Sequence, residues 1–471
     1  MLTREQLEPL SKDELIEIIL SLSAQVDALV AQVARLEAQL RELHSAKAPF
    51  GKGKRKLAPK PPGRHAGKGK FTRRTEPVAG PGDEVQELDA PLPVDERNCP
   101  KCEVPLVTRN EVVTVEDMPA QPQRIIRRIT VEVGRCPQCG FTVRGHHPCM
   151  GSHQWGANAH QLGPRVIAHA LALHYDTGLP LRKVPKVIDT LTGISLTQSA
   201  LTQRAGKLCD QGALLDEHYQ NLREQVAQSD VVNTDDTGWR IGAVLAFVMG
   251  FFTRTTSYYQ IRRRHRHEEV LEVIGEEFAG KLGTDRGKSY EANAMKDVAM
   301  QKCVSHLLVN LSEVEAEKTG RAKSFSRQLK ATLREGLTLW QRYKAKEMSL
   351  GSYRRRGAMI ERKLNEQLRQ RELTDADNRR LLKGLRIQHE RGRLTLFLHE
   401  PDIEPTNNSA ERGLRPVVIA RKVSQCSKNE RGARSYAVLR TVFETLRKRT
   451  ANVIGAFTEL LSGKPFPTGS R

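Results

Sequence analysis

The chain lacks the usual features of a membrane or secreted protein. Among its 471 residues, no run approaches the ~18 apolar residues of a membrane span, so we expect no contact with a membrane. Its first residues do not follow the order of a signal peptide. Cysteines number only eight, and four of them form Cys-x-x-Cys pairs. This usage indicates a reducing cytosol and metal binding rather than disulfides.

Acidic residues are scarce relative to basic ones. Lys and Arg together number 76 against 55 Asp and Glu, which gives a net charge of +21. Such a surplus indicates an anionic partner, and nucleic acid is the first candidate, although a basic surface can also serve solubility alone. The chain is too long for one ordinary core, so we expect several domains.

Residues 1–44 contain a heptad repeat of apolar residues. Nine of them are spaced alternately by four and three: Leu15, Ile19, Leu22, Val26, Leu29, Val33, Leu36, Leu40 and Leu43. Mostly β-branched residues occupy one seam position and leucines the other. This pattern favours a parallel two-stranded coiled coil and hence a homodimer. The alternative is an amphipathic helix that packs on its own chain.

Residues 45–95 have no pattern that could build a core. Positions 45–75 hold many basic residues, no acid, and several prolines and glycines. This composition predicts a disordered basic linker. The linker either contacts DNA phosphates or is a solvated tether. The residues chosen as DNA-binding candidates are Lys54, Arg55, Lys56, Arg73 and Arg74.

Residues 96–150 carry two Cys-Pro-x-Cys pairs. The first pair is Cys99 and Cys102, and the second is Cys136 and Cys139. Each pair can form a tight turn that directs two thiolates at one ion. Strands are predicted over 111–115 and 125–134, between the pairs. Two such turns joined by a hairpin predict a Cys₄ zinc ribbon with a structural Zn²⁺.

Residues 151–225 show helical patterning. A helix over 181–191, a break at Thr192-Gly193, and Ser195 as N-cap of a second helix predict a helix–turn–helix. Such a unit could place its second helix in the major groove of DNA. An ordinary helical hairpin fits the pattern equally well.

From residue 226 the periodicity changes to that of strands. Strands are predicted over 231–233, 244–252, 257–261, 280–284 and 303–308, with a helix over 267–278 between the third and the fourth. This order predicts an α/β fold with an RNase H-like mixed sheet, whose first part spans 226–318.

Two further segments complete the predicted core. Residues 319–400 read as a charged helical insertion, whose basic run at 354–356 indicates either a DNA-contacting surface or a solvated helical face. Residues 401–471 return to the core with its final helices and a C-terminal tail.

Three acidic residues stand in positions that suit catalysis. Asp235 and Asp285 each end a predicted strand, and Glu411 lies near the start of a predicted helix. Strand ends and a helix can bring these carboxylates together at one edge of a sheet. Carboxylates suit Mg²⁺ or Mn²⁺, and a pair of ions can clamp both oxygens of a phosphodiester displacement. Because clustered carboxylates repel one another, we expect cations between them.

Each acid also has an ordinary structural reading. Asp285 can form a turn, and Glu411 can stabilise a helix N-terminus or pair with Arg415. Asp236 follows Asp235 directly, but side chains alternate along a strand, so the two acids face opposite sides. We therefore predict Asp235, rather than Asp236, as the metal ligand.

Other polar residues accompany these acids. Asn408, Arg412 and Arg415 can lie beside Glu411, where they would hold phosphate or support the site. His306 is either an ordinary sheet histidine or a residue that supports the site or contacts DNA.

Several motifs together resemble one family. Segment 407–416, followed by 420–422, closely resembles the C-terminal signature of insertion-sequence 66 family transposases. Segment 234–237 resembles the family's first acidic box, although Asp236 replaces its usual Glu. Segments 285–290 and 303–306 resemble its second aspartate box and the Cys-x-x-His after it. Leu308-Val309-Asn310 replaces the basic residues that usually follow.

The resemblance implies a DDE transposase with an RNase H-like core. Such an enzyme would cut DNA at the ends of a bacterial insertion sequence and join the freed 3′-OH to target DNA. It also implies accessory proteins encoded by the same element, and a cytoplasmic, nucleoid-associated location. Two alternatives stay open: a catalytically degenerate, sequence-specific DNA-binding protein, and a nuclease of the same fold that cuts without joining.

Overall fold

The computed structural model describes residues 11–46, 85, 103–105, 124–145, 147, 149–150, 161–285, 287–424 and 426–469. The chain divides into two compact units, Met1–Met118 and Pro119–Arg471. The five basic linker residues named above lie outside the described residues, as do Cys99 and Cys102.

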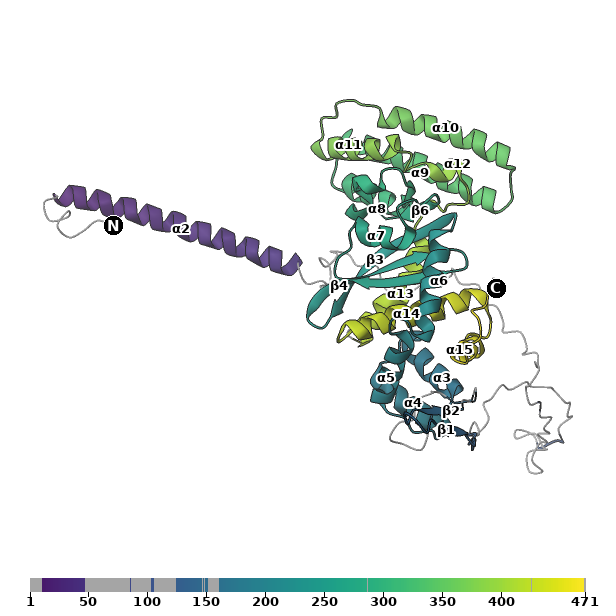
Figure 1. The fold of residues 1–471 in the computed structure, drawn as a ribbon. Helices are drawn as coiled ribbons and strands as arrows, with labels where there is room; N and C mark the ends of the chain where they lie inside the picture. Colours follow the sequence, from purple (N-terminus) through teal and green to yellow (C-terminus); the bar gives the residue numbers. More distant parts are fainter. Residues whose placement is uncertain are drawn as a thin grey trace. The chain divides into compact units, whose positions relative to one another are not determined.

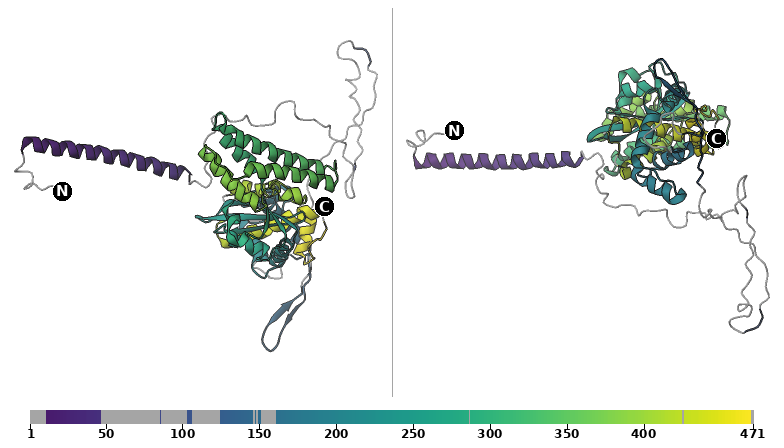
Figure 2. Two further views of the ribbon diagram at one scale, coloured as in Figure 1. Left: turned by 90° about the horizontal axis from the view of Figure 1, so that it is seen from above. Right: turned by 60° about the horizontal axis from the view of Figure 1, so that its bottom comes forward.

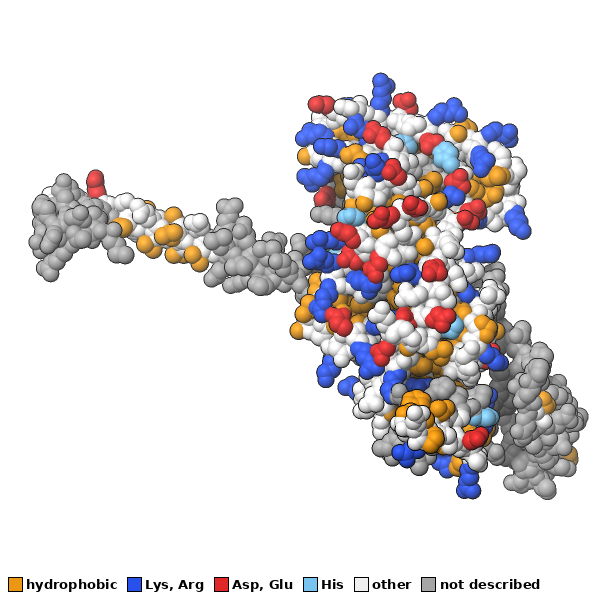
Figure 3. Space-filling model, viewed as in Figure 1, with side chains coloured by type: hydrophobic (Ala, Val, Ile, Leu, Met, Phe, Trp, Pro, Cys, Tyr) orange, Lys and Arg blue, Asp and Glu red, His pale blue; other side chains and the backbone are white. Residues whose placement is uncertain are grey.

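The first unit contains one long helix, α2 (Lys12–Ala46), as the heptad repeat predicts. Hydrophobic side chains gather along its surface (Figure 3). Those that are large and exposed are Ile16, Leu20, Leu22, Val26, Leu29, Val30 and Val33. Such a row of exposed apolar residues needs a partner surface.

One stretch of this helix is apolar enough on average to span a membrane, although it contains no unbroken run of ~18 apolar residues. Leu15–Val33 is 19 residues long with a mean hydropathy of 1.5, which suffices by length and composition. Serine, glutamine, Glu17 and Asp27 interrupt the apolar residues, so no unbroken run stands out. The many Ile, Leu, Val and Ala between them nevertheless keep the average high.

If α2 forms the coiled coil, replacing Leu22 and Leu29 by Asp will dissociate the dimer. Both leucines occupy the same heptad position, so the change buries charge in the seam. The matched control places Asp at Ala24 and Ala31, on the outer face of the same helix. Sedimentation should show monomers for the seam variant and dimers for the control. An unchanged oligomer in the seam variant would contradict the coiled coil.

The second unit is built on a five-stranded mixed sheet. Its strands are β3 (Val231–Ile241), β4 (Val244–Phe252), β5 (Ser257–Arg262), β6 (Lys281–Thr284) and β7 (Ala299–Lys302). They lie in the order β5-β4-β3-β6-β7. The pairs from β5 to β3 are antiparallel, whereas β6 pairs in parallel with both β3 and β7. The predicted mixed α/β class is confirmed, and the topology is consistent with an RNase H-like core.

Helices surround the sheet (Figure 1). Before it come α3 (Pro164–Tyr175), α4 (Val184–Thr192), α5 (Gln198–Cys209) and α6 (Leu214–Ala227). Between strands lies α7 (His267–Ile274), and after β7 come α8 (Val304–Ala316), α9 (Ala322–Lys344), α10 (Leu350–Leu368), α11 (Ala376–Glu390) and α12 (Leu396–His399). The chain ends with α13 (Asn408–Ser424), α14 (Glu430–Arg449) and α15 (Val453–Leu461).

The predicted strand over 303–308 is wrong. The fifth strand is β7, and the chain enters helix α8 directly after Cys303. Val304, Leu307 and Leu311 are buried at helical spacing. The true strand escaped prediction because it contains Lys302, a residue type that is rarely buried in a strand.

Both edges of the sheet are covered. At the β5 edge, the hydroxyls of Thr441 and Thr445 in α14 accept the backbone N–H groups of Tyr259 and Ser257, at 2.9 and 3.1 Å. At the other edge, the backbone N–H of Lys302 donates to the carbonyl of Arg393 at 2.8 Å. The edge strands therefore have little backbone free to pair with another chain.

Helices α9–α12 form the predicted insertion and share a core of their own with α8. Leu329, Leu333, Tyr353 and Phe397 belong to this core. Figure 2 shows α9, α10 and α11 lying together. The side chain of Gln301 in β7 accepts the backbone N–H of Phe397 at 3.0 Å, which fastens the insertion to the sheet.

Helices α4 and α5 are the two predicted helices of this segment, and both pack on α3. Gly193 ends α4 in a left-handed conformation, with φ of +62°. Thr197, not Ser195, is the N-cap of α5: its hydroxyl accepts the backbone N–H of Ala200 at 3.2 Å. Ser195 instead bonds to Asp189. Whether α4 and α5 bind DNA stays a prediction.

The described part of the predicted zinc ribbon is a small antiparallel hairpin of β1 (Val133–Arg135) and β2 (Thr142–Arg144). Most of the predicted strand over 125–134 is therefore irregular, and 111–115 lies outside the described residues. Between the strands, the Cys136 N–H donates to the carbonyl of Phe141 and the Gly140 N–H donates to the carbonyl of Cys136, at 2.8 and 3.0 Å. This tight turn presents Cys136 and Cys139 together.

Candidate active site

The three predicted acids come from three elements that meet at β3. Asp285 directly follows β6, and Glu411 lies in the first turn of α13, both as predicted. Asp235 does not end its strand, because β3 continues to Ile241. However, β6 pairs with β3 only as far as Asn233, so Asp235 lies just beyond the parallel part of the sheet. Asp235 therefore lies near the end of β6, which Asp285 directly follows.

Asn407 fastens the start of α13 to the sheet. Its side-chain N–H donates to the carbonyl of Thr234 at 2.8 Å, next to Asp235. The backbone carbonyl of Asn407 accepts the backbone N–H of Glu411 at 3.1 Å. Asn407 directly precedes α13, and its side-chain amide bonds to β3. The bond sets Glu411 close to Asp235.

A glycine lets α13 lie close against β4. A Cβ atom added at Gly413 would lie 2.2 Å from the Phe252 ring, far inside van der Waals contact. The carbonyl of Gly413 also accepts the Tyr259 hydroxyl at 2.8 Å. Position 413 must therefore be glycine for the helix to hold Glu411 at this depth.

Local backbone bonds orient the two aspartates. An Asp285 carboxylate oxygen accepts the N–H of Gly287 at 2.8 Å. An Asp235 oxygen accepts the N–H of Asp236 at 2.9 Å. Each of these bonds engages one of the two carboxylate oxygens and fixes the orientation of the side chain.

Burial and neighbouring negative charge act strongly on Asp235. Burial, followed by repulsion from Asp285, Asp236 and Glu411, raises the pKa of Asp235 to about 7. The backbone N–H of Asp236 offsets part of this rise. Asp285 and Glu411 therefore lie near enough to act on Asp235 electrostatically. Among the described residues, the ligand atoms found within 4.8 Å of one another belong to Cys303, His306 and Glu411 rather than to the three acids.

Asp236 has a different environment. Its carboxylate lies 3.2 Å from Nδ1 of His265, whose ring stacks on Phe247 with centroids 3.8 Å apart. Burial raises the pKa of Asp236, whereas His265 opposes the rise. Sequence reasoning missed His265, because nothing in a run of arginines and histidines marks one member as a partner of Asp236.

A buried ionic network supports the loop after Asp285. Glu291 pairs with Lys302 at 2.9 Å and with Arg393 at 3.2 Å, and both cations are almost fully buried. Tyr290 is fully buried too, and its hydroxyl lies 3.4 Å from that of Thr234. These residues were missed as well, because Arg393 lies about 100 positions away in the insertion and no local pattern pairs it with Glu291.

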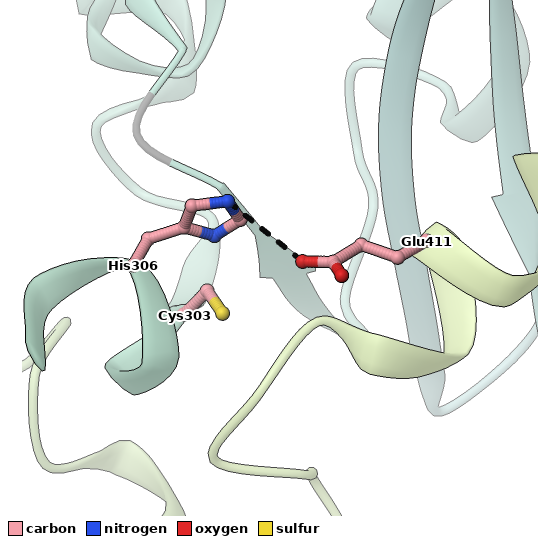
Figure 4. Close-up of side chains that lie close together, drawn as sticks. All are labelled: Cys303, His306 and Glu411. Atoms are coloured by element: carbon pink, nitrogen blue, oxygen red, sulfur yellow. Dashed lines mark ion pairs between the residues drawn. The ribbon is translucent and has the colours of Figure 1, made fainter. Parts of the chain in front are cut away.

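His306 lies beside the third acid. Because it belongs to helix α8, the reading of an ordinary sheet histidine is wrong. Its Nε2 lies 3.7 Å from an oxygen of Glu411, and both side chains are nearly half exposed. Cys303, one helical turn earlier, completes a compact group with these two residues (Figure 4).

The remaining predicted residues line the outer surface of α13. Asn408, Arg412 and Arg415 are exposed. Among the residues that the structure describes, the ion-pair partner of Glu411 is His306 rather than Arg415. The two arginines are therefore available to an anion.

The carboxylate cluster suits divalent cations. Its donors are hard oxygens, which Mg²⁺ and Mn²⁺ prefer. Within the described part of the chain, the ion-pair partner of the three acids is His306, and the neighbouring Asp236 pairs with His265; neither partner is a Lys or Arg. Burial, followed by repulsion from the neighbouring carboxylates, raises the pKa of Asp235, and bound cations would relieve the repulsion.

Comparison with known proteins adds one finding. A family model described as "Transposase IS66 family" matches residues 159–435, more than half of the chain. No curated protein matches the sequence significantly.

Asp235→Asn should stabilise the metal-free protein at pH 8. The folded state holds the Asp235 proton more tightly than the unfolded state, so stability falls as pH rises toward about 7 and the penalty remains above it. The amide removes the penalty and should raise Tm by about 2–4 °C per kcal/mol relieved. At pH 5 the difference in Tm between Asp235→Asn and the wild type should be smaller.

Asp230→Asn is the matched control, because Asp230 is exposed and precedes the same strand. Adding Mg²⁺ should raise Tm of the wild type and the control more than that of Asp235→Asn. A destabilised Asp235→Asn protein at pH 8 would contradict the electrostatic reading of the site.

Proposed function

Because this chain belongs to the IS66 transposase family of DDE polynucleotidyl transferases, we propose the following route by which it carries out transposition. Asp235, Asp285 and Glu411 form its catalytic triad. The reaction is metal-dependent cleavage of double-stranded DNA at the ends of the insertion sequence, followed by attack of the freed 3′-OH on target DNA.

The observation that carries this proposal is the convergence of three acids from distant segments. Asp285 and Glu411 both raise the pKa of Asp235, although the three residues lie on separate elements. Bringing like-charged carboxylates together costs free energy, and a folded protein retains such an arrangement where a ligand or a reaction uses it. A pair of divalent cations is the ligand that this donor set fits best.

Asp235, Asp285 and Glu411 would hold the ions. Bound there, two ions about 3.5–4 Å apart would stabilise negative charge on both the attacking and the leaving oxygen. The bonds to Gly287 and Asp236 fix one oxygen of each aspartate, so the other oxygens are oriented before any ion arrives. His306 can donate a hydrogen bond to Glu411 and hold it in place.

Asp236 is not part of the proposed triad. His265 engages the carboxylate of Asp236, whereas no such ion-pair partner is found for Asp235 among the described residues, although Asp285 raises the pKa of both aspartates. These contacts support the choice of Asp235 that the alternation of side chains suggested.

The outer face of α13 is the proposed path of the DNA backbone next to the triad. Arg412, Arg415 and Lys422 are exposed, and their spacing of three and seven places them on one side of the helix. Phosphates held by these residues would lead toward Glu411. The basic linker residues would add contacts that weaken with salt.

We also propose that the two Cys-Pro-x-Cys pairs hold a structural Zn²⁺. The N–H groups of Cys139 and Gln138 lower the pKa of the Cys136 thiol. A turn that stabilises a thiolate in this way suits a zinc ligand. The finer assignment of the core as RNase H-like rests on the strand order, in which the first three strands are antiparallel and the last two join in parallel.

Asp235→Asn, Asp285→Asn and Glu411→Gln should each abolish Mg²⁺-dependent cleavage and joining while DNA binding persists. Each amide keeps the shape of the side chain but removes the charge that holds the ions. A loss of ~4 kcal/mol of transition-state stabilisation slows the step about a thousandfold. The measurement is cleavage and strand transfer on DNA that carries the element's terminal repeats.

Glu430→Gln is the control, because Glu430 is also an exposed glutamate in the first turn of a helix. Asp236→Asn should be milder than Asp235→Asn. Full activity in Glu411→Gln would refute the triad, and cleaved but never joined DNA in the wild type would indicate a nuclease instead.

A further inference from the structure

Cys303, His306 and Glu411 form a compact group of three different donor atoms. The Cys303 Sγ, a His306 ring nitrogen and a Glu411 oxygen all lie within 4.8 Å of one another. Figure 4 shows the Cys303 side chain, just before α8, and the His306 side chain of α8 directed toward the same space as Glu411 of α13. Cys303 is buried, whereas His306 and Glu411 are open to solvent.

The donor set differs from that of the acidic triad. A sulfur, an imidazole nitrogen and a carboxylate oxygen are the ligands of Zn²⁺ and similar transition metals, whereas Mg²⁺ avoids sulfur. Zinc bonds of about 2.0–2.3 Å place tetrahedral ligands roughly 3.3–3.8 Å apart. The His306–Glu411 separation of 3.7 Å already falls in this range. Small rotations of these two exposed side chains would bring the sulfur into range as well.

The sulfur of Cys303 faces polar backbone groups of its surroundings. The backbone N–H of Asn407 donates to its sulfur at 3.2 Å. Cys303 also stands immediately before α8, a helix of 13 residues whose N-terminal dipole stabilises negative charge. Both effects act on the atom that a soft metal would bind.

We propose that Cys303, His306 and Glu411 bind a Zn²⁺-class ion, and that this ion withdraws Glu411 from the Mg²⁺ site and thereby inhibits the enzyme. Three protein ligands leave a fourth position for water or a DNA phosphate. The inhibitory half rests on the proposed function, because it requires Glu411 as a Mg²⁺ ligand. The binding half stands on the geometry alone.

Cobalt titration of the full-length protein tests the binding half. Co²⁺ is the probe, and thiolate-to-cobalt absorption is the readout, with any signal from the Cys₄ ribbon as a constant background. The wild type should bind one more equivalent than Cys303→Ser and His306→Gln. Cys426→Ser, which changes a half-buried cysteine outside the group, should match the wild type.

His306→Gln guards against misfolding of the Cys303 variant, because His306 is exposed and its replacement leaves the core intact. Equal cobalt spectra and stoichiometry in the wild type and both site variants would overturn the proposed metal site.

Zinc inhibition tests the second half. Each protein's Mg²⁺-dependent cleavage rate is divided by its own zinc-free rate. The zinc concentration that halves the rate should rise at least about tenfold in Cys303→Ser and stay unchanged in Cys426→Ser. No inhibition of the wild type, or equal inhibition of both variants, would overturn the regulatory claim. Absence of cleavage in every protein would refute the proposed function, while the cobalt result would still decide the metal site.

Discussion

The hydrogen bond from the Asn407 side chain to the carbonyl of Thr234 joins two segments that are 173 positions apart. One of its ends is next to Asp235 and the other is four residues before Glu411. Because Asn407 is buried, breaking the bond would leave polar groups without water, at a cost of about 1–3 kcal/mol. Its backbone N–H also contacts Cys303. This one residue therefore sets the distances among β3, α8 and α13 on which both proposed metal sites depend.

The hydrogen bond between Asn407 and Thr234 also has an electrostatic cost. It holds Glu411 near two aspartates, which raises the pKa of Asp235. Other contacts offset this cost. Helix α14 covers one edge of the sheet and the insertion covers the other, and Lys302 and Arg393 neutralise Glu291 below the site. The scaffold can therefore keep a repulsive cluster in place until cations bind to it.

Local patterns predicted much of the fold and the elements near which two of the acids lie. Strands β4, β5 and β6 and the Glu411 helix follow from hydrophobic runs and helix-start signals, and so does the position of Asp285 after its strand. What failed depends on contacts distant in sequence. β7 contains a buried lysine that only Glu291 explains, and Asp235 lies within a long strand because β4 accompanies β3 beyond the end of β6.

The supporting residues escaped prediction for the same reason. Nothing near Asn407 in the sequence shows that its amide reaches Thr234, and nothing near His265 shows that it faces Asp236. His306 was assigned to a strand because the Cys-Val-Ser-His segment alternates in polarity, whereas burial of Leu307 and Leu311 makes it a helix.

The central claim is that Asp235, Asp285 and Glu411 form one divalent-metal site. Anomalous diffraction from crystals of the full-length protein soaked in Mn²⁺ tests it most directly. The triad predicts manganese peaks bonded to carboxylate oxygens of all three residues, at about 2.0–2.3 Å. Manganese bound to Asp236 and His265 instead, or no peak among the three acids, would contradict it.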